Sequence, residues 1–113
     1  GLLTTTTASY GQVWVTLTLH RAASAANTAG VVELGPLTML RELDTSAGSA
    51  YLDTLYHWLR HPTDPRAASS ELRIHPNTLR YRMRRIVELT GVDMDDPDTR
   101  LALLTQLITL RWN

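Results

Sequence analysis

The residue types that could do chemistry in this chain are concentrated between positions 60 and 90. All eleven basic residues of the 113-residue chain are arginines, because it contains no lysine. Seven of them lie between Arg60 and Arg85, against only two acids, Asp64 and Glu71. Guanidinium groups bind phosphate and carboxylate in a forked, bidentate geometry. The local excess of positive charge therefore indicates a surface that meets a polyanion.

The neutral charge of the whole chain does not argue against this interpretation. The formal net charge is zero because the segment 88–98 holds five acids and no base, which offsets the basic segment before it. A basic stripe beside an acidic one gives an oriented field, and DNA responds to the local stripe rather than to the sum.

The sequence contains no recognisable catalytic motif. Without cysteine the chain has no disulfide, no thiolate nucleophile and no cysteine-based zinc site. It contains neither a phosphate-binding loop nor a dinucleotide fingerprint. His75 has no indicated nucleophile or carboxylate partner with which it would act as a base. We therefore predict that the protein is not an enzyme and uses no cofactor.

Two groups of residues contain side chains that can bind metals, but each is better explained by another role. His57 and His61 are four residues apart, a spacing that can bind a metal, but no third ligand is evident. We interpret them as surface histidines near a phosphate backbone. The acids at 93–98 lack the central Gly and final Glu of a calcium loop. Asp96 is better explained as a helix N-cap with Asp98 in the first turn, so no metal is predicted.

Four helices are predicted in the second half of the chain. Leu52, Leu55, Tyr56 and Leu59 follow the i, i+3, i+4, i+7 pattern of an amphipathic helix, which ends at His61-Pro62. Three later helices each begin with proline at the first helical position, after Asp64, His75 and Asp96. They are expected over about 65–72, over 76–90 with a stop at Gly91, and from 97 onward, where Leu101, Leu104 and Ile108 with Leu103, Leu107 and Leu110 form a broad apolar stripe.

The first 46 residues are less regular. Residues 12–19 alternate as a strand would, but the whole stretch is also compatible with one helix ending near Gly30. A short helix is predicted over 37–43 and a polar break over 44–48. We place a boundary there, which gives a 1–46 extension, interpreted as the remnant of an upstream domain and its linker, and a 47–113 domain.

The helix over 76–90 has two different sides. Leu79, Met83, Ile86 and Val87 cluster on one, and the other presents Asn77, Tyr81, Arg84, Arg85 and Glu88, with Thr78 on the flank. With the helix over 65–72 and a turn at Arg73 and Ile74, in which Ile74 is buried, this is typical of a helix-turn-helix.

The residues expected to read bases are Asn77, Thr78 and Tyr81. Those expected to contact phosphates are Arg66, Arg73, His75, Arg84 and Arg85. Arg80 and Arg82 flank the buried stripe and are interpreted as partners of an ion pair within the domain, for example with Glu71.

The motif Leu72-Arg-Ile-His-Pro-Asn-Thr-Leu-Arg-Tyr-Arg-Met-Arg-Arg-Ile86, followed by Thr90-Gly-Val-Asp-Met-Asp-Asp-Pro97, resembles the C-terminal helix-turn-helix of PucR/CdaR-type transcriptional regulators. The similarity runs from about Tyr51 to Leu110. It departs from the family at Pro76, where a basic residue is common, and at Met83, where leucine is common. The resemblance implies a transcription factor whose effector-sensing region lies N-terminal to this chain and is absent from it.

The fold class is therefore predicted as mainly α, a three-to-four-helix helix-turn-helix domain with a short N-terminal extension. Double-stranded DNA is the expected partner, bound in the major groove by the helix over 76–90. A helical interaction or dimerisation module without DNA binding is the alternative, and a homodimer is compatible with either. No apolar run is long enough to span a bilayer and no signal peptide is evident, so we expect no membrane association and a cytoplasmic location.

Overall fold

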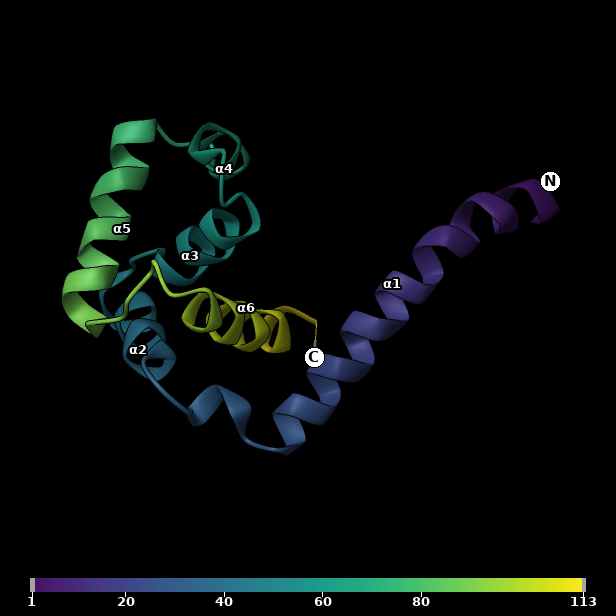
Figure 1. The fold of residues 1–113 in the computed structure, drawn as a ribbon, viewed down its shortest axis with the longest axis horizontal. Coiled ribbons are helices and arrows are strands. Elements are labelled where there is room, and N and C mark those ends of the chain that lie inside the picture. Colours follow the sequence, from purple (N-terminus) through teal and green to yellow (C-terminus); the bar gives the residue numbers. More distant parts are fainter. Residues whose placement is uncertain (1, 113) are drawn as a thin grey trace.

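The computed structural model describes residues 2–112, with side-chain surroundings from residue 11 onward, and this part of the chain holds helices and no β-strand (Figure 1). In chain order the elements are α1 (Leu2–Thr28), the 3-10 turn η1 (Val31–Glu33), α2 (Leu37–Ala47), α3 (Tyr51–Arg60), α4 (Pro65–Leu72), α5 (Pro76–Thr90) and α6 (Pro97–Trp112). The prediction of a mainly α fold with a helix-turn-helix is confirmed.

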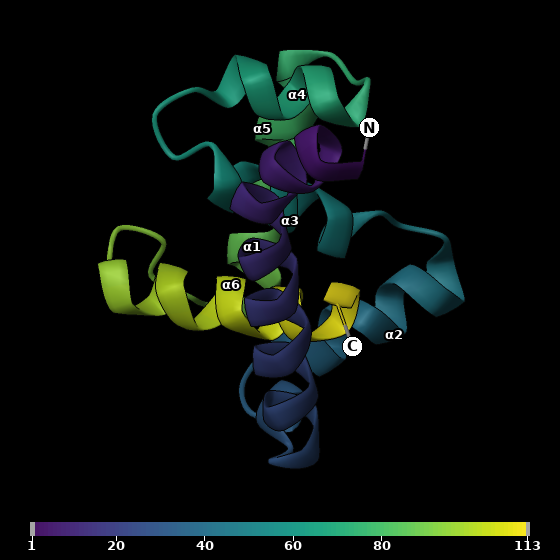
Figure 2. The ribbon, with the colours of Figure 1, turned by 90° about the vertical axis from the view of Figure 1, so that its right-hand side faces the viewer.

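The alternative of a strand over residues 12–19 is wrong, because these residues belong to the single helix α1. A strand needs a neighbouring strand for its backbone N–H and C=O groups, whereas a helix satisfies them internally. The N-terminal half of α1 projects away from the other helices, and the C-terminal half lies beside α6 (Figures 1 and 2). There Ala23 is buried and the ring of His20 meets that of Trp112 edge-on at 5.3 Å. Gly30, in the left-handed conformation (φ 72°), follows the end of the helix as predicted.

Helix α2 is longer than predicted. The stretch 44–47, expected to be part of a polar break, forms its last turn, and the helix ends at Gly48 (φ 68°). The carboxylate of Asp44 links this last turn to the start of α3. It accepts hydrogen bonds from the hydroxyl of Ser49 at 2.6 Å and from the backbone N–H groups of Tyr51 and Leu52 at 2.8 and 3.0 Å. Asp44 thus satisfies the free donors at the start of α3, a role that no local pattern reveals.

One hydrophobic core joins α2 to the four helices that follow it. The buried members of this core are Leu37, Leu40, Leu55, Tyr56, Leu59, Ala68, Leu79, Met83, Ile86, Leu103 and Leu107. The division that we predicted after residue 46 therefore falls in the last turn of a helix whose first residues are buried with α3, α5 and α6. That division remains a hypothesis.

The apolar stripe of α6 faces the core along a different line from the one expected. Leu103 and Leu107 are buried, whereas Leu101, which was placed in the stripe, is 63% exposed. The orientation is fixed in part by Gln106, whose side-chain amide nitrogen donates to the carbonyl oxygens of Val31 at 2.8 Å and Leu34 at 2.5 Å. Leucines surround this helix, so their positions alone could not indicate which side is covered.

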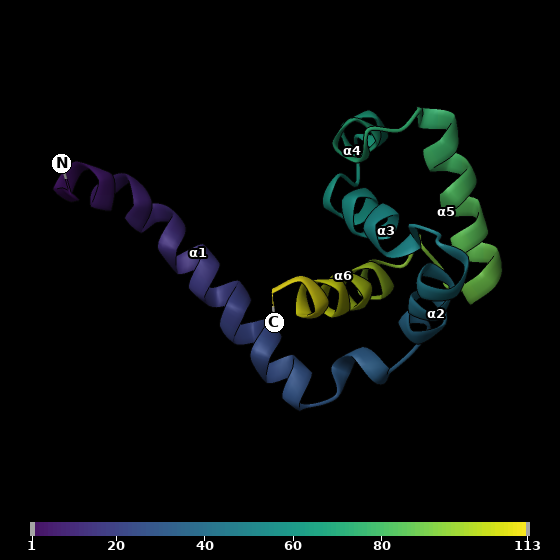
Figure 3. The same ribbon diagram turned by 180° about the vertical axis from the view of Figure 1, so that it is seen from behind.

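The face of α5 away from the core is at the edge of the molecule. Figures 1 and 3 show this helix on the side of the domain opposite the projecting α1, with α4 at its N-terminal end. The helices of the described part include none that is long and apolar enough to cross a membrane.

Candidate nucleic-acid interface

The first helix of the predicted motif begins and ends as the sequence indicates. The carboxylate of Asp64 accepts from the backbone N–H of Ala67 at 3.2 Å, and Pro65 occupies the first helical position. At the other end Arg73 has φ 56°, the only positive φ of a non-glycine residue in the described part of the chain. The N–H groups of Arg73 and Ile74 donate to the carbonyls of Ser70 (3.1 Å) and Ser69 (3.0 Å). This pair of bonds is a Schellman motif, which stops α4 and starts the turn.

The turn and the start of α5 set the angle between the two helices. Ile74 is partly buried and packs against the core, in agreement with the prediction that it fills the turn. His75 caps α5, because its Nδ1 accepts a hydrogen bond from the backbone N–H of Asn77 at 3.0 Å. Pro76 follows at the first helical position and Gly91, at φ 71°, ends the helix. The predicted bounds of α4 and α5 are confirmed.

Helix α5 is held by one side and free on the other. Leu79, Met83 and Ile86 are buried in the core as expected. Val87 was placed with them but is 38% exposed. Val87 lies at the edge of the predicted apolar stripe, and near the C-terminal end of the helix this edge faces outward.

The residues expected to read bases are accessible. Tyr81 is 57% exposed, Asn77 is exposed and Thr78 is half-buried, and all three lie in the first turns of α5. The amide oxygen of Asn77 accepts a hydrogen bond from the Arg80 guanidinium. Their function as base contacts remains a prediction, but their exposure meets its geometric condition.

The residues expected to contact phosphates fall into two groups. Arg66, Arg73, His75 and Arg84 are exposed, and the arginines among them form no ion pair within the described residues. Arg85 is half-buried, and its Nη1 donates to Glu88 Oε2 at 3.0 Å. Hydrogen bonding from Arg85 to Glu88, and then to Tyr51, raises the pKa of Arg85 above its ordinary value. Arg85 would therefore have to exchange Glu88 for a phosphate.

The interpretation of Arg80 and Arg82 as partners of Glu71 is wrong. Arg82 Nη1 lies 3.4 Å from the hydroxyl of Thr54 and so connects α5 to α3, while Arg80 is exposed and contacts Asn77. Sequence reasoning thus missed an exposed cation next to a predicted base reader. The available signal was the i, i+3 spacing of Asn77 and Arg80, which places their side chains on neighbouring turns.

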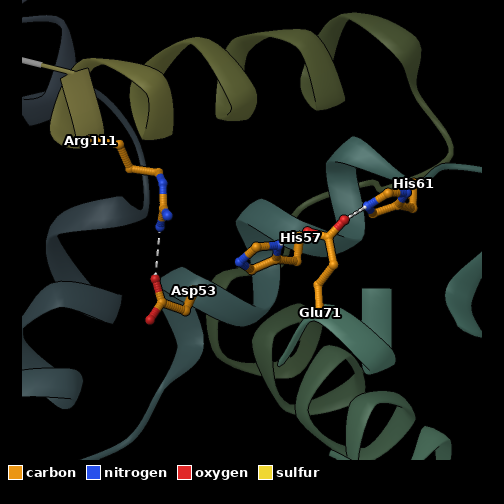
Figure 4. Close-up of polar contacts among 5 residues, drawn as sticks. All are labelled: Asp53, His57, His61, Glu71 and Arg111. Carbon is orange, nitrogen blue, oxygen red and sulfur yellow. Dashed lines mark hydrogen bonds and ion pairs between the residues drawn. The ribbon is translucent and has the colours of Figure 1, made fainter. Parts of the chain in front are cut away.

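Glu71 instead lies between His57 of α3 and His61, which follows the last residue of that helix (Figure 4). His57 Nδ1 is 2.7 Å from Glu71 Oε2, and His61 Nε2 contacts the other carboxylate oxygen. Hydrogen bonding from His61, and then from His57, lowers the pKa of Glu71. These ring nitrogens therefore hold α4 against α3. The interpretation that the two histidines lie near a phosphate backbone remains a prediction. Among the described residues no group of three or more potential ligands is arranged to hold a metal ion.

The acidic segment before α6 has the capping role predicted for it. Asp96 Oδ2 accepts from the backbone N–H of Thr99 at 2.8 Å and from its hydroxyl at 2.7 Å. These hydrogen bonds lower the pKa of Asp96. In the connection before α6, Asp93 also accepts a hydrogen bond, from the backbone N–H of Asp95 at 3.0 Å. The carboxylates are thus engaged with backbone donors of the connection and the first turn of α6.

Comparisons with known proteins agree with this geometry. The family model of the PucR C-terminal helix-turn-helix domain matches residues 51–109, more than half of the chain. The carbohydrate diacid regulator of Escherichia coli is 44% identical over 72 residues, which cover 64% of this chain and 18% of that protein. The proline-responsive transcriptional activator PutR of Bacillus subtilis is 33% identical over 75 residues, covering 66% of this chain and 18% of that protein.

The chain therefore spans less than a fifth of the length of these two regulators. No solved structure is matched. The matched segment contains α3, α4 and α5 and most of α6, which are the elements that position the exposed face of α5. This chain belongs to the family of proteins that carry the PucR C-terminal helix-turn-helix domain.

Proposed function

We propose that this domain binds double-stranded DNA in a sequence-specific manner and acts in transcription regulation. The observation that carries the proposal is the two-sided nature of α5: one side is buried in the core, and the other exposes Asn77, Tyr81 and Arg84 at the edge of the molecule. In helix-turn-helix proteins the second helix of the motif enters the major groove in this way. Two relatives are named as a regulator and a transcriptional activator, which supports the same role.

In the proposed complex the first turns of α5 face the base edges. The Asn77 amide matches the donor and acceptor pair that adenine presents in the major groove, and Thr78 and Tyr81 are placed to contact thymine methyl groups. Arg66, Arg73, His75, Arg84 and Arg85 meet phosphates and fix the register of the helix. The effector-sensing region of the regulator is proposed to lie N-terminal to these residues.

The proposal is tested by selecting bound sequences from random DNA and measuring affinity by fluorescence anisotropy across a series of salt concentrations. Replacing both Arg84 and Arg85 by Gln should weaken binding and flatten the log–log salt slope by about 0.9 for each lost phosphate contact. Arg21→Gln makes a control, because Arg21 is exposed on α1, outside the helix-turn-helix. DNA binding by the double variant that equals wild type would contradict the proposal.

Base reading is tested separately from phosphate contact. Asn77→Ala should lose about 1–3 kcal/mol of discrimination at one A·T pair of the selected site while keeping its affinity for unrelated DNA. A loss that is equal on all sequences would assign Asn77 to the backbone contacts instead.

The alternative of an interaction or dimerisation module is favoured by one observation on α1. Val13, Trp14 and Leu17 are 46%, 61% and 45% exposed, although apolar side chains of this size usually have a partner. Sedimentation of the full chain with and without Trp14→Ser would reveal a dimer that uses this surface. Such a dimer is compatible with DNA binding and would double the number of arginine contacts.

A further inference from the structure

A hollow lies between the first turns of α4 and α5. It has a volume of about 490 Å³ and is lined by Pro65 and Arg66 of one helix and by His75, Pro76 and Arg80 at the start of the other. The two prolines form its apolar walls. The three remaining side chains are all exposed and all carry nitrogen donors.

The charge of this hollow is uncompensated. No acidic residue lines it, and neither Arg66 nor Arg80 forms an ion pair within the described part of the chain. The nearest acid along the sequence, Asp64, caps α4, because one of its carboxylate oxygens accepts a hydrogen bond from the backbone N–H of Ala67. Two guanidinium groups with no anionic partner in a shared cavity favour an anionic ligand.

His75 contributes a donor whose position is determined by its capping role. Its Nδ1 accepts from the N–H of Asn77 at 3.0 Å and so carries no proton in this arrangement. The proton of the neutral ring is then on Nε2, which is free to donate to a ligand. The ring can therefore cap α5 through one nitrogen and bind an anion through the other at the same time.

Arg80 connects the hollow to a predicted base reader. Its guanidinium donates to the amide oxygen of Asn77. Bidentate reading of adenine needs that oxygen to accept from the exocyclic amino group while the amide nitrogen donates to N7. The contact with Arg80 uses one of the two lone pairs of that oxygen and turns the amide toward Arg80. Asn77 must leave this orientation before its amide can align with a base edge.

We infer that the hollow binds one phosphate of the DNA backbone and that this phosphate draws Arg80 away from Asn77. The inference rests on the proposed DNA-binding function and deepens it. A guanidinium–phosphate contact pairs two opposite charges and can be bidentate, whereas the amide oxygen of Asn77 is a neutral acceptor, so the exchange is favourable. Arg66, His75 and Arg80 hold the phosphate, and its arrival frees Asn77 to read a base. Backbone contact and base reading are therefore coupled through Arg80.

The test uses the full chain and a DNA site obtained by selection, with each backbone phosphate near the α5 footprint replaced in turn by an uncharged methylphosphonate. For wild type, one position should weaken binding by about tenfold, the loss expected for a charge-assisted hydrogen bond. Arg80→Met should weaken binding to unmodified DNA to a similar extent, flatten the salt slope by about 0.9 and be insensitive to that same methylphosphonate. Arg80→Lys, which keeps the charge, should keep the salt slope.

The coupling has its own readout. The methylphosphonate at that position leaves Arg80 on Asn77, so it should reduce adenine discrimination in wild type. In Arg80→Met, where Asn77 has lost its intramolecular partner, the same methylphosphonate should leave adenine discrimination unchanged. If Arg80 only orders Asn77, Arg80→Met leaves the salt slope and every methylphosphonate effect unchanged, and the inference is overturned.

Failure of the wider proposal looks different. In that case wild type itself shows no salt-dependent DNA binding, and the double Arg84 and Arg85 variant matches it. Circular dichroism of each variant verifies that the exposed Arg80 position tolerates the substitution.

Discussion

Glu71 of α4 and His57 of α3 are joined by a hydrogen bond of 2.7 Å between Oε2 and Nδ1. The other oxygen of the same carboxylate contacts His61, the residue at the C-terminal end of α3. A single acid on the first helix of the helix-turn-helix is thus held by two rings, one on the supporting helix and one at its end (Figure 4). This contact fixes α4, and through the turn it fixes the angle at which α5 is presented.

The Glu71 contact predicts a dependence of stability on acid pH. Because the folded state lowers the pKa of Glu71 below 4.5, its ordinary value, the stabilising contribution is complete above that value and is lost as pH falls through the lower folded pKa. Urea unfolding from pH 7 to pH 3 should therefore show a steeper loss of stability for wild type than for Glu71→Gln. Glu42→Gln, an exposed site on α2, should follow wild type. Parallel curves for wild type and Glu71→Gln would contradict this role.

Because the backbone of Arg73 is left-handed, we predict that the protein is more stable with glycine at this position than with alanine. A side chain at φ 56° costs about 1 kcal/mol, which glycine avoids. Arg73→Gly should raise the free energy of unfolding by up to about 1 kcal/mol relative to Arg73→Ala, which keeps the strain. Both variants should lose the same DNA affinity if Arg73 contacts a phosphate. Equal stability of the two variants would show that the turn carries no such strain.

The sequence predicted the helix-turn-helix well because its signals are local. Asp64-Pro65, His75-Pro76 and Gly91 each act within one helical turn, so the bounds of α4 and α5 could be predicted without knowledge of the neighbouring helices. The accessible positions of Asn77 and Tyr81 followed from the helical period alone.

The remaining features depend on contacts between elements far apart in sequence. Glu71 had arginines and histidines within reach as partners, and only the packing of α4 on α3 selects the histidines. Asp44 caps α3 from seven and eight residues away, a contact that no local pattern in the predicted break indicates. The orientation of α6 depends on Gln106 bonding to carbonyls more than seventy residues earlier. Alternation over 12–19 was equally compatible with a strand and a helix, and its pattern contained nothing to decide between them.

The cap of α5 is predicted to depend on an acceptor at position 75. His75→Ala removes the acceptor for the N–H of Asn77 and should lower the free energy of unfolding by about 0.5–2 kcal/mol. His75→Asn supplies an oxygen acceptor at the same position and should restore most of this loss. If both variants are equally destabilised, the imidazole contributes through packing and not through the hydrogen bond. DNA affinity should fall in both, because neither retains the Nε2 donor.

Gln106 is predicted to be the polar contact that ties the 31–34 connection to α6. It is 7% exposed and donates to the carbonyl oxygens of Val31 and Leu34, so Gln106→Leu removes both hydrogen bonds. Each such bond contributes about 0.5–1.5 kcal/mol net, and chemical denaturation should therefore show a loss of about 1–3 kcal/mol. Leu101→Ala on the same helix, at a site 63% exposed, should change stability by less than about 0.5 kcal/mol.

Amide hydrogen exchange of Gln106→Leu separates a local effect of this substitution from a global one. Faster exchange confined to 29–36 means that Gln106 anchors only this connection, whereas faster exchange throughout α5 means that it also supports the helix proposed to bind DNA. Unchanged stability in Gln106→Leu would refute the prediction.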